Sequence, residues 1–563
     1  MGAQSITLGQ NTISSIAKSD PLIITGAIGT QNTFYNSSVG GGYRSPWANT
    51  LSANLNIQLY GISMPFAFFY SNNNSSFSFP HISFHIDPTY KNWRAHLGRS
   101  SMGMSSYIMN MSFDGIGLEY TAQKLRFGAF YGKLRSAVND DPTDPAARQP
   151  QYRRMGWGFK VGYGSGSDYI DLYLIRAYDR LNSIDEYWQD RIDPQENVAI
   201  GLKGGLGVTK WLSLRGNLAF SAFSKDFRAQ RIKSATLDKW DKIFEARYSS
   251  LMRIAGDVSA NLNLKNFNTS VFYRMVQPDY TTLGLYYIAN NYQSLGINAS
   301  TSLFKKLSLS ASFSGQEDNI TRNQLYTTRG FVYSANASMP ITEKLQMAVG
   351  YSGYRQVQSD GTARVNDTTR VNRTMNTLFL TPSYSVEGDH YDHIFSLSVN
   401  YSENKDLNRF ATGESDVKTL AAGLSYSLGL RDLEMDVTTS LSHQQSKGYN
   451  TRYSSDVLSV STGRSFLKEK NLQVSAGLSF CYNDVQNQQR MLSLAADMSA
   501  GYTLKSHVFS LTANFNKYSD TNLSADNASM GASEITVSLG YTYTFSLLEI
   551  KRKAEKKQSK EEQ

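Results

Sequence analysis

Short stretches in which apolar and polar residues alternate recur along most of this chain. The last clear example is V-S-L-G-Y-T-Y-T-F, residues 537–545, where five apolar residues alternate with small polar ones. A β-strand sends successive side chains to opposite faces, so this stretch has one apolar face and one small polar face. Aromatic residues rim the apolar face, as in barrel strands that cross a membrane interface.

About ten stretches share this alternation, and it predicts strands over much of the chain. One such stretch would fit a half-buried strand of a soluble sheet equally well. Repetition along the whole chain instead favours a barrel with lipid outside and a polar interior. The clearest further examples are 154–163, 198–207, 212–220, 252–262, 492–502 and 509–515.

The connections between these strands are of two kinds, which alternate strictly. One kind is tight and usually carries lysine, as at Thr209-Lys210, and the other is long and polar, as at 354–372. This asymmetry is typical of bacterial outer-membrane barrels. The pattern predicts an all-β protein, a transmembrane antiparallel up-and-down β-barrel of about 26 strands over residues 21–545. The alternative is 24 strands with residues 74–112 inside the lumen.

The two chain ends are expected to lie outside the barrel. Residues 1–20 form a polar N-terminal lead-in, and residues 546–563 form a tail with charges of both signs. An even strand number places both termini in the periplasm of a bacterial outer membrane. A barrel must be exported, and no apolar signal core precedes Gln4, so we infer that a signal was trimmed. The tail is interpreted as a solvent-exposed chain end, and the alternative is that it binds a periplasmic partner.

The composition excludes membrane-spanning helices and intramolecular disulfides, and it argues against nucleic-acid binding. Mean hydropathy is −0.39, and the longest apolar run, 64–70, is far shorter than a membrane helix needs. Cys481 is the single cysteine, so no intramolecular disulfide forms, and alternation places it on the inward face. The net charge is +9, but basic residues are scattered without a clustered basic-aromatic motif, so nucleic acid is not expected as a partner.

Charged residues occur on the predicted inward faces of several strands. If the cations line open water, they favour the passage of anions. If they are paired with carboxylates across the lumen, they only stabilise the shape of the barrel. The sequence leaves both interpretations open. The predicted lumen-lining residues are Arg126, Arg154, Lys160, Lys203, Arg215 and Arg253, with Asp171, Asp257 and Asp497 as acids.

Residues 79–98 hold three of the seven histidines and predict a hairpin with a turn after Asp87. Histidines four residues apart on a strand are about 13 Å apart, too far to chelate one ion, and steps of about 7 Å do not form a nucleophile arrangement. We therefore expect no enzyme activity, metal or cofactor, and favour a gate or a polar lumen network. Its candidate residues are His81, Ser83, His85, Arg94 and His96.

Two long loops have sequence patterns that predict structure or binding. Apolar residues recur at helical spacing within 224–250, which predicts a short amphipathic helix on the barrel rim or inside it. Loop 276–292 is rich in tyrosine, including Tyr280, which suits sugar stacking, protein contact or an aromatic belt.

The segments 60–70, 96–107 and 118–132, together with the closing strand, resemble large outer-membrane β-barrel proteins of the Bacteroidota type. Tyr541 and the aromatic pattern around it resemble the terminal signal by which such barrels are inserted, although further residues follow. The resemblance implies outer-membrane lipids and the barrel-insertion machinery as partners. It implies no settled activity and carries over no catalytic residue. The residues of this insertion signal are Tyr541, Tyr543 and Phe545.

Two functional hypotheses follow from the predicted barrel. The first is a porin-like or transport channel with a partly plugged lumen. The second is a non-enzymatic barrel subunit of a larger protein-insertion or secretion complex, with other outer-membrane proteins or lipoproteins as partners. Barrel diameter grows with strand number, so a barrel this wide needs a filling. The candidate fillings are residues 74–112, residues 224–250 or a partner.

Overall fold

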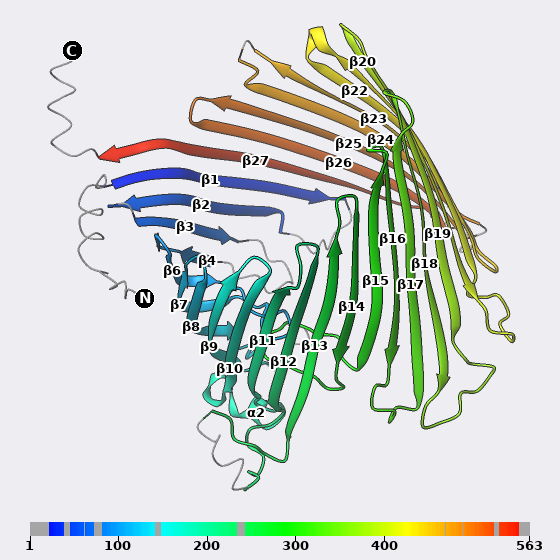
Figure 1. The fold of residues 1–563 in the computed structure, drawn as a ribbon. Helices are drawn as coiled ribbons and strands as arrows, with labels where there is room; N and C mark the ends of the chain where they lie inside the picture. Colours follow the sequence, from blue (N-terminus) through cyan, green and yellow to red (C-terminus); the bar gives the residue numbers. More distant parts are fainter. Residues whose placement is uncertain are drawn as a thin grey trace.

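The first and last strands of the chain are neighbours. In the computed structural model, β1 (Leu22–Ser37) pairs antiparallel with β2 (Trp47–Leu59) on one side and with β27 (Ser529–Ile550) on the other. The sheet therefore closes into a ring (Figure 1). The structure describes residues 22–38, 45–60, 62–72, 82–140, 148–233, 243–467, 469–486, 488–522 and 529–550.

Each remaining strand pairs with neighbours along the chain. The strands of the first half are β3 (Ile62–Ser71), β4 (Ile82–Ile86), β5 (Thr89–Tyr90), β6 (Trp93–Ser100), β7 (Phe113–Thr121), β8 (Leu125–Arg135), β9 (Arg153–Ser165), β10 (Asp168–Arg180), β11 (Glu196–Gly207), β12 (Leu212–Ser224), β13 (Ser250–Asn263) and β14 (Phe267–Val276). The strands of the second half are β15 (Tyr292–Leu303), β16 (Leu307–Asp318), β17 (Tyr326–Pro340), β18 (Leu345–Asp360), β19 (Asn372–Glu387), β20 (Tyr391–Asp406), β21 (Val417–Leu430), β22 (Met435–Lys447), β23 (Arg452–Phe466), β24 (Leu472–Val485), β25 (Gln489–Leu504) and β26 (His507–Asn522).

Helix is confined to short turns within the described ranges: η1 (Leu181–Ser183), α2 (Glu186–Gln189) and η3 (Arg431–Leu433). Across the part of the chain that the structure describes, we find no helix with the length and apolarity to cross a membrane.

The ring has 26 strand positions, because β4 and β5 share the place between β3 and β6. The prediction of an antiparallel barrel of about 26 strands is confirmed. The 24-strand alternative is wrong, because residues 82–100 form wall strands, and of the described part of 74–112 only the connection 101–112 enters the lumen. Residues 74–81, which that alternative also included, lie outside the described residues.

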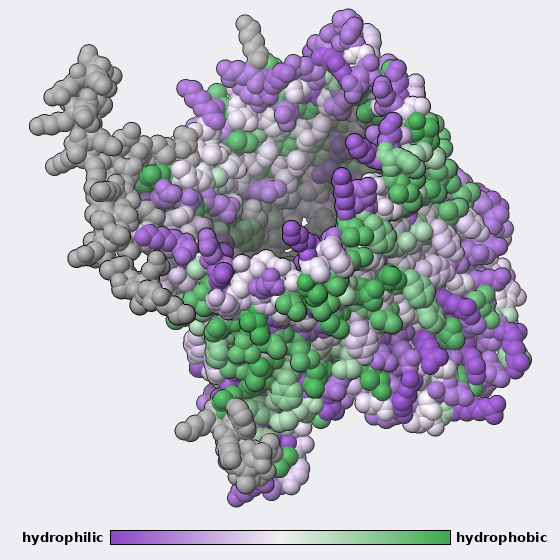
Figure 2. Space-filling view, in the orientation of Figure 1, coloured by the Kyte–Doolittle hydropathy of each residue, from purple (hydrophilic) through white to green (hydrophobic). Residues whose placement is uncertain are grey.

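The wall has two chemically different faces. Outward residues are large and apolar, as for Leu202, Leu218 and Val258, which are 43%, 54% and 52% exposed. Apolar residues gather on the outer wall over β9–β13, and polar residues border the hollow of the barrel (Figure 2). A soluble protein rarely exposes a continuous belt of such residues, whereas a lipid-facing wall requires one. The barrel is therefore a membrane-spanning one.

The two ends of the barrel differ in the length of their connections. One end, here the short-turn end, has tight turns such as residues 505–506, and the other, the long-loop end, has loops such as 225–249. Strand β1 begins at the short-turn end and β27 ends there, because Leu22 pairs with both Leu59 and Ile550. Strand β27 thus continues past residue 545, the predicted end of the barrel.

Candidate functional site

The connection between β6 and β7, residues 101–112, lies inside the barrel, and we call it the plug segment. β6 has 8 residues and β7 has 9, whereas β9 and β10 each have 13, so this connection leaves the wall early. It turns inward and packs on inward-facing residues of β8–β13. Ile108, at its centre, is completely buried. The buried cluster is formed by Met102, Tyr107, Ile108, Met109, Met111, Phe113, Phe130, Leu134, Tyr173, Ile175, Ala177, Ala199, Ala219, Phe223, Ala255, Val276, Tyr280 and Leu283.

The connection between β14 and β15, residues 277–291, completes this core, and we call it the plug loop. The Tyr280 hydroxyl donates to the Tyr107 carbonyl oxygen at 2.7 Å, and the Thr282 hydroxyl donates to that of Ile108 at 3.0 Å. The Gly284 carbonyl accepts from the backbone N–H groups of residues 110 and 111 at 3.0 and 3.1 Å. Burial raises the pKa of the Tyr280 hydroxyl above its usual range, so the group remains a donor.

Small residues on the inner wall make room for the plug segment. A Cβ atom at Gly201 of β11 would lie 2.3 Å from Cδ1 of Ile108. In the plug loop, a Cβ atom at Gly284 would likewise lie 2.5 Å from the Ile108 carbonyl oxygen. Ala199, Ala219 and Ala255 pack against the same segment from β11–β13. Glycine and alanine therefore serve close packing at these inward positions.

Polar side chains of the wall also hold the plug segment and the plug loop, which we together call the plug. The Ser105 hydroxyl donates to Oδ1 of Asn217 on β12 at 2.7 Å. Asn197 on β11 accepts from the backbone N–H of Leu283 at 3.1 Å. Arg253 on β13 donates from Nε to the carbonyl oxygen of Pro278 at 2.8 Å. Packing and polar contacts together make the plug a fixed part of one side of the barrel.

Three of the predicted lumen cations are neutralised by carboxylates. Arg126 Nη2 lies 2.8 Å from Asp171 Oδ1, and Lys160 pairs with Glu119. Arg154 forms a buried two-pronged pair with Asp179, at 2.8 and 3.0 Å. These pairs support the interpretation that the charges hold the shape of the wall.

Two other predicted lumen cations are not neutralised by any carboxylate among the described residues. Lys203 and Arg215 form no ion pair with any residue that the structure describes. Both occupy inward positions nearer the short-turn end than the plug core, and Lys203 is the register partner of Asn217. The predicted acid Asp257 lies opposite Arg274 and beside Tyr107, which brings it under the plug segment.

The other side of the lumen has a different lining. On β16–β27 and β1 the inward positions carry mainly serine, threonine, asparagine and glycine, and hydroxyls pair across neighbouring strands. Asp497 on β25 is an inward acid in this region, opposite Gly477 and Asn514. We call this surface the hydroxyl wall. Its hydroxyl pairs include Thr33–Ser538, Ser312–Ser334, Ser383–Ser396, Thr419–Ser446, Ser427–Thr438, Ser440–Ser459 and Ser475–Ser499.

The predicted gate residues separate into two groups. His96 is 1% exposed, and its ring lies between Asp87 (3.2 Å from Nδ1) and Glu119 (3.0 Å from Nε2). Arg94 Nη2 reaches Oδ2 of the same Asp87 at 2.6 Å. Ser83 and His85 face inward on β4 but form no hydrogen bond or ion pair with these network residues, and His81 lies outside the described residues. Among the residues described, no group of three or more His, Cys, Asp or Glu could hold a metal ion.

Some residues of these networks were not assigned from the sequence. Glu119 and Asp179 are examples, although strand parity gives a signal for both. Glu119 alternates with Leu118, which is exposed on the outer face, and Asp179 shares the parity of Asp171 on β10. What parity does not give is the partner on the neighbouring strand.

The described part of loop 225–249 lies against the outer wall. Phe244 packs with Val198 and Ala222, whose strand parity is outward, and Ile243 packs against the same cluster. Residues 234–242, on which most of the predicted helix falls, lie outside the described residues. The described part of this loop therefore covers the outside of the barrel at the long-loop end and does not fill the lumen.

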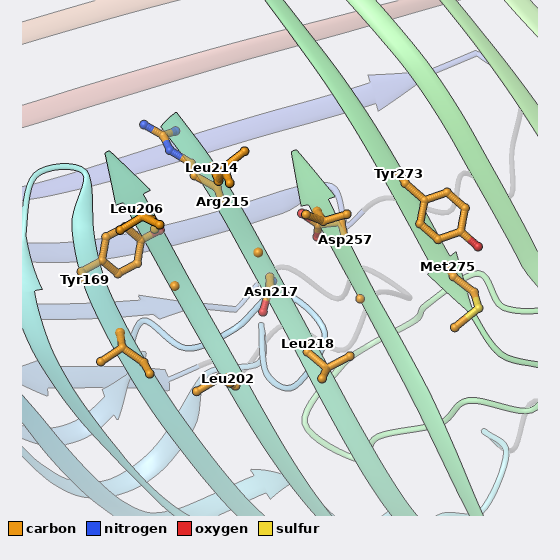
Figure 3. A pocket seen from close by; sticks show the side chains of 16 residues that line it. Tyr169, Leu202, Leu206, Leu214, Arg215, Asn217, Leu218, Asp257, Tyr273 and Met275 are labelled. Carbon is orange, nitrogen blue, oxygen red and sulfur yellow. The ribbon is translucent and has the colours of Figure 1, made fainter. Parts of the chain in front are cut away.

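The wall also has a recess of about 610 Å³ across β10–β14 (Figure 3). Its apolar residues, among them Leu202, Leu206, Leu214 and Tyr273, belong to the exposed outer face. The recess is thus part of the lipid-facing surface and not of the lumen.

No family model and no curated protein matches this chain. Several solved structures show a distant likeness. OccAB2 of Acinetobacter baumannii is 12% identical, with 63% of this chain and 93% of that chain covered and a TM-score of 0.29. The outer membrane protein opdK of Pseudomonas aeruginosa is 11% identical, with 66% and 98% covered and a TM-score of 0.29. The translocation pore of the P pilus usher PapC is 11% identical, with 93% and 100% covered and a TM-score of 0.35. Likeness at this level carries no functional argument, so the assignment of a membrane-spanning barrel rests on the strand pairing and the two faces of the chain itself.

Proposed function

We propose that this protein is a porin-like outer-membrane channel whose lumen is filled on one side and open along the other. The observation that carries the proposal is the asymmetry of the inner face. On β8–β13 many inward residues form a buried apolar core with the plug segment, whereas the hydroxyl wall presents paired serine and threonine side chains. Hydroxyl groups offer donors and acceptors to water and to polar solutes.

The charge distribution favours weak ion selectivity in this conduit. The ion pairs of Arg126, Arg154 and Lys160 cancel their fields at short range. Lys203 and Arg215 are offset by the inward acid Asp497 on the opposite side. We therefore propose small hydrophilic solutes, mainly uncharged ones, as the transported class.

The proposed setting is the outer membrane of a bacterium of the Bacteroidota type, with the short-turn end and both termini in the periplasm. Outer-membrane lipids surround the apolar wall. The barrel-insertion machinery acts on the closing strand through Tyr541, Tyr543 and Phe545, of which Tyr541 and Tyr543 share the outward parity of Leu539. The short-turn asymmetry and the aromatic closing strand support this orientation.

The test is single-channel conductance in planar bilayers. Wild-type protein is compared with a variant in which residues 102–111 are replaced by a flexible Gly-Ser linker. A matched control replaces residues 362–370, in the β18–β19 loop at the long-loop end, by the same linker. The proposal expects a measurable wild-type conductance, a larger one without the plug segment, and an unchanged one in the control.

Absence of conductance in both wild type and the plug variant would contradict the channel. Stoichiometric co-purification of another outer-membrane protein or a lipoprotein in the same preparation would then favour the alternative, a barrel subunit of an insertion or secretion complex.

A further inference from the structure

One junction in the wall has few backbone pairings. Among the described residues, β4 pairs with β6 at His85–Gly98 and Ile86–Leu97, and β5 pairs with β6 at its two residues. One more backbone bond runs from the Ala95 N–H to the Pro88 carbonyl oxygen at 2.8 Å. By contrast, β24 and β25 pair continuously along their whole length. We call the junction of β4 and β5 with β6 the clasped seam.

The cause of the interruption is visible in the sequence. Asp87 and Pro88 separate β4 from β5, and proline has no N–H to donate to a ladder. The next junction along, between β6 and β7, is again continuous from Trp93–Tyr120 to Ser100–Phe113. The weakness is therefore local to one side of β6.

Side chains replace the missing ladder at this seam. The carboxylate of Asp87 is nearly buried and takes three partners, all from β6. Arg94 reaches Oδ2 at 2.6 Å, while Ser100 and His96 reach Oδ1 at 3.1 and 3.2 Å. Hydrogen bonds to an ionised carboxylate are stronger than neutral ones, so one residue can hold the strand.

The same network continues to the plug. His96 bridges from Asp87 to Glu119 on β7, and Glu119 pairs with Lys160 on β9. Lys160 donates in turn to the carbonyl oxygen of Gly103 in the plug segment, at 3.3 Å. β6 also runs directly into this segment after Ser100. The seam and the plug are thus joined both by the chain and by a line of charged contacts.

We propose that the clasped seam is a conformational device: Asp87 holds β6 against β4 and β5, and its release loosens the seam and the plug segment together. The wall then opens locally at this seam, where few backbone pairings hold the strands together. The device does not depend on whether the lumen conducts, because it concerns only the coupling of wall and plug.

The test is hydrogen exchange measured by mass spectrometry on the purified full-length protein in detergent micelles. Asp87→Asn keeps the size of the side chain and removes its charge. We expect amides in both 93–100 and 101–112 to exchange about tenfold faster, with 472–504 unchanged. The matched control, Asp497→Asn, removes an inward carboxylate that forms no ion pair with the described residues. It should leave 93–112 unchanged.

Exchange in Asp87→Asn that equals wild type, or that rises in 93–100 alone, would overturn the coupling. A disulfide across the seam gives a second, independent measurement. Ile86→Cys and Leu97→Cys, in a Cys481→Ser background, place two thiols at register partners with a shared outward parity. Oxidation should slow exchange of 101–112 several-fold with Asp87 intact and should restore slow exchange with Asp87→Asn. No change on oxidation in either protein would refute the device.

Discussion

The hydroxyl of Tyr280 donates a hydrogen bond to the backbone carbonyl oxygen of Tyr107, 2.7 Å away and 173 positions earlier in the chain. Both side chains are buried in the core that joins the plug segment to the plug loop. Two connections between wall strands thus meet inside the barrel and form one core with the inner wall. This relationship makes the plug testable by single substitutions.

Tyr280→Phe keeps the aromatic ring and removes this hydrogen bond. The buried carbonyl oxygen of Tyr107 is left without its donor, which should destabilise the plug by about 1–2 kcal/mol. Hydrogen exchange of residues 101–112 measures this loss directly. Tyr287→Phe, on an exposed side chain of the same loop, is the control and should have no effect. Equal exchange in the two variants would show that the contact contributes nothing.

Gly201→Leu places a side chain where Ile108 packs. The Cβ atom alone would approach Cδ1 of Ile108 to 2.3 Å, so the plug segment must shift, at a cost of about 1–3 kcal/mol. We expect faster exchange in residues 101–112 and a changed conductance. Gly501→Leu is the matched control, since a Cβ atom at this position of β25 meets nothing within 4 Å. If Gly201→Leu behaves like Gly501→Leu, the plug is not packed on β11.

Asp497→Asn removes an inward negative charge from the hydroxyl wall. Without it, the fixed charge that faces the lumen becomes more positive, so the channel should become more anion-selective. The reversal potential in a salt gradient measures this shift. Asp456→Asn removes the same charge from a residue of outward parity on β23, which pairs with His443. A shift of equal size in both variants would argue against a conduit along the hydroxyl wall.

Leu478→Arg and Ser479→Arg place the same charge on opposite faces of neighbouring residues in the middle of β24. Leu478 is 59% exposed on the outer face, so its replacement should cost about 2–4 kcal/mol in the bilayer. Ser479 faces the lumen, where arginine remains hydrated and the cost should be small. Urea unfolding in lipid vesicles, followed by tryptophan fluorescence, compares the two. Equal destabilisation would contradict the assignment of the faces.

Much of the wall follows from the sequence because a strand has a fixed period of two. Alternation alone separates Leu202 from Lys203 and assigns Arg154 and Lys160 to one face of β9, and tight and long connections give the number of strands. The aromatic face of the closing strand is equally local, since it depends only on successive residues. These features need no knowledge of distant contacts.

The plug could not be predicted in the same way. The segment M-G-M-S-S-Y-I-M-N-M, residues 102–111, has no strand alternation, and it packs against a loop more than 150 residues away. The tyrosines of loop 276–292 look alike in sequence, yet Tyr280 is buried while Tyr287 is 80% exposed. Likewise, whether Arg126 is free depends on Asp171, two strands along the wall. Such pairings are decided by tertiary packing.

The pairing of β1 with β27 has a consequence for the order in which the protein assembles. The Thr33 and Ser538 hydroxyls that meet across it are 505 positions apart, so closing this junction carries the largest loss of chain entropy in the ring. The plug joins residues 173 positions apart and needs only the first half of the strands. Its core is therefore expected to form against an open, growing sheet, and the barrel then closes around a lumen that is already partly filled.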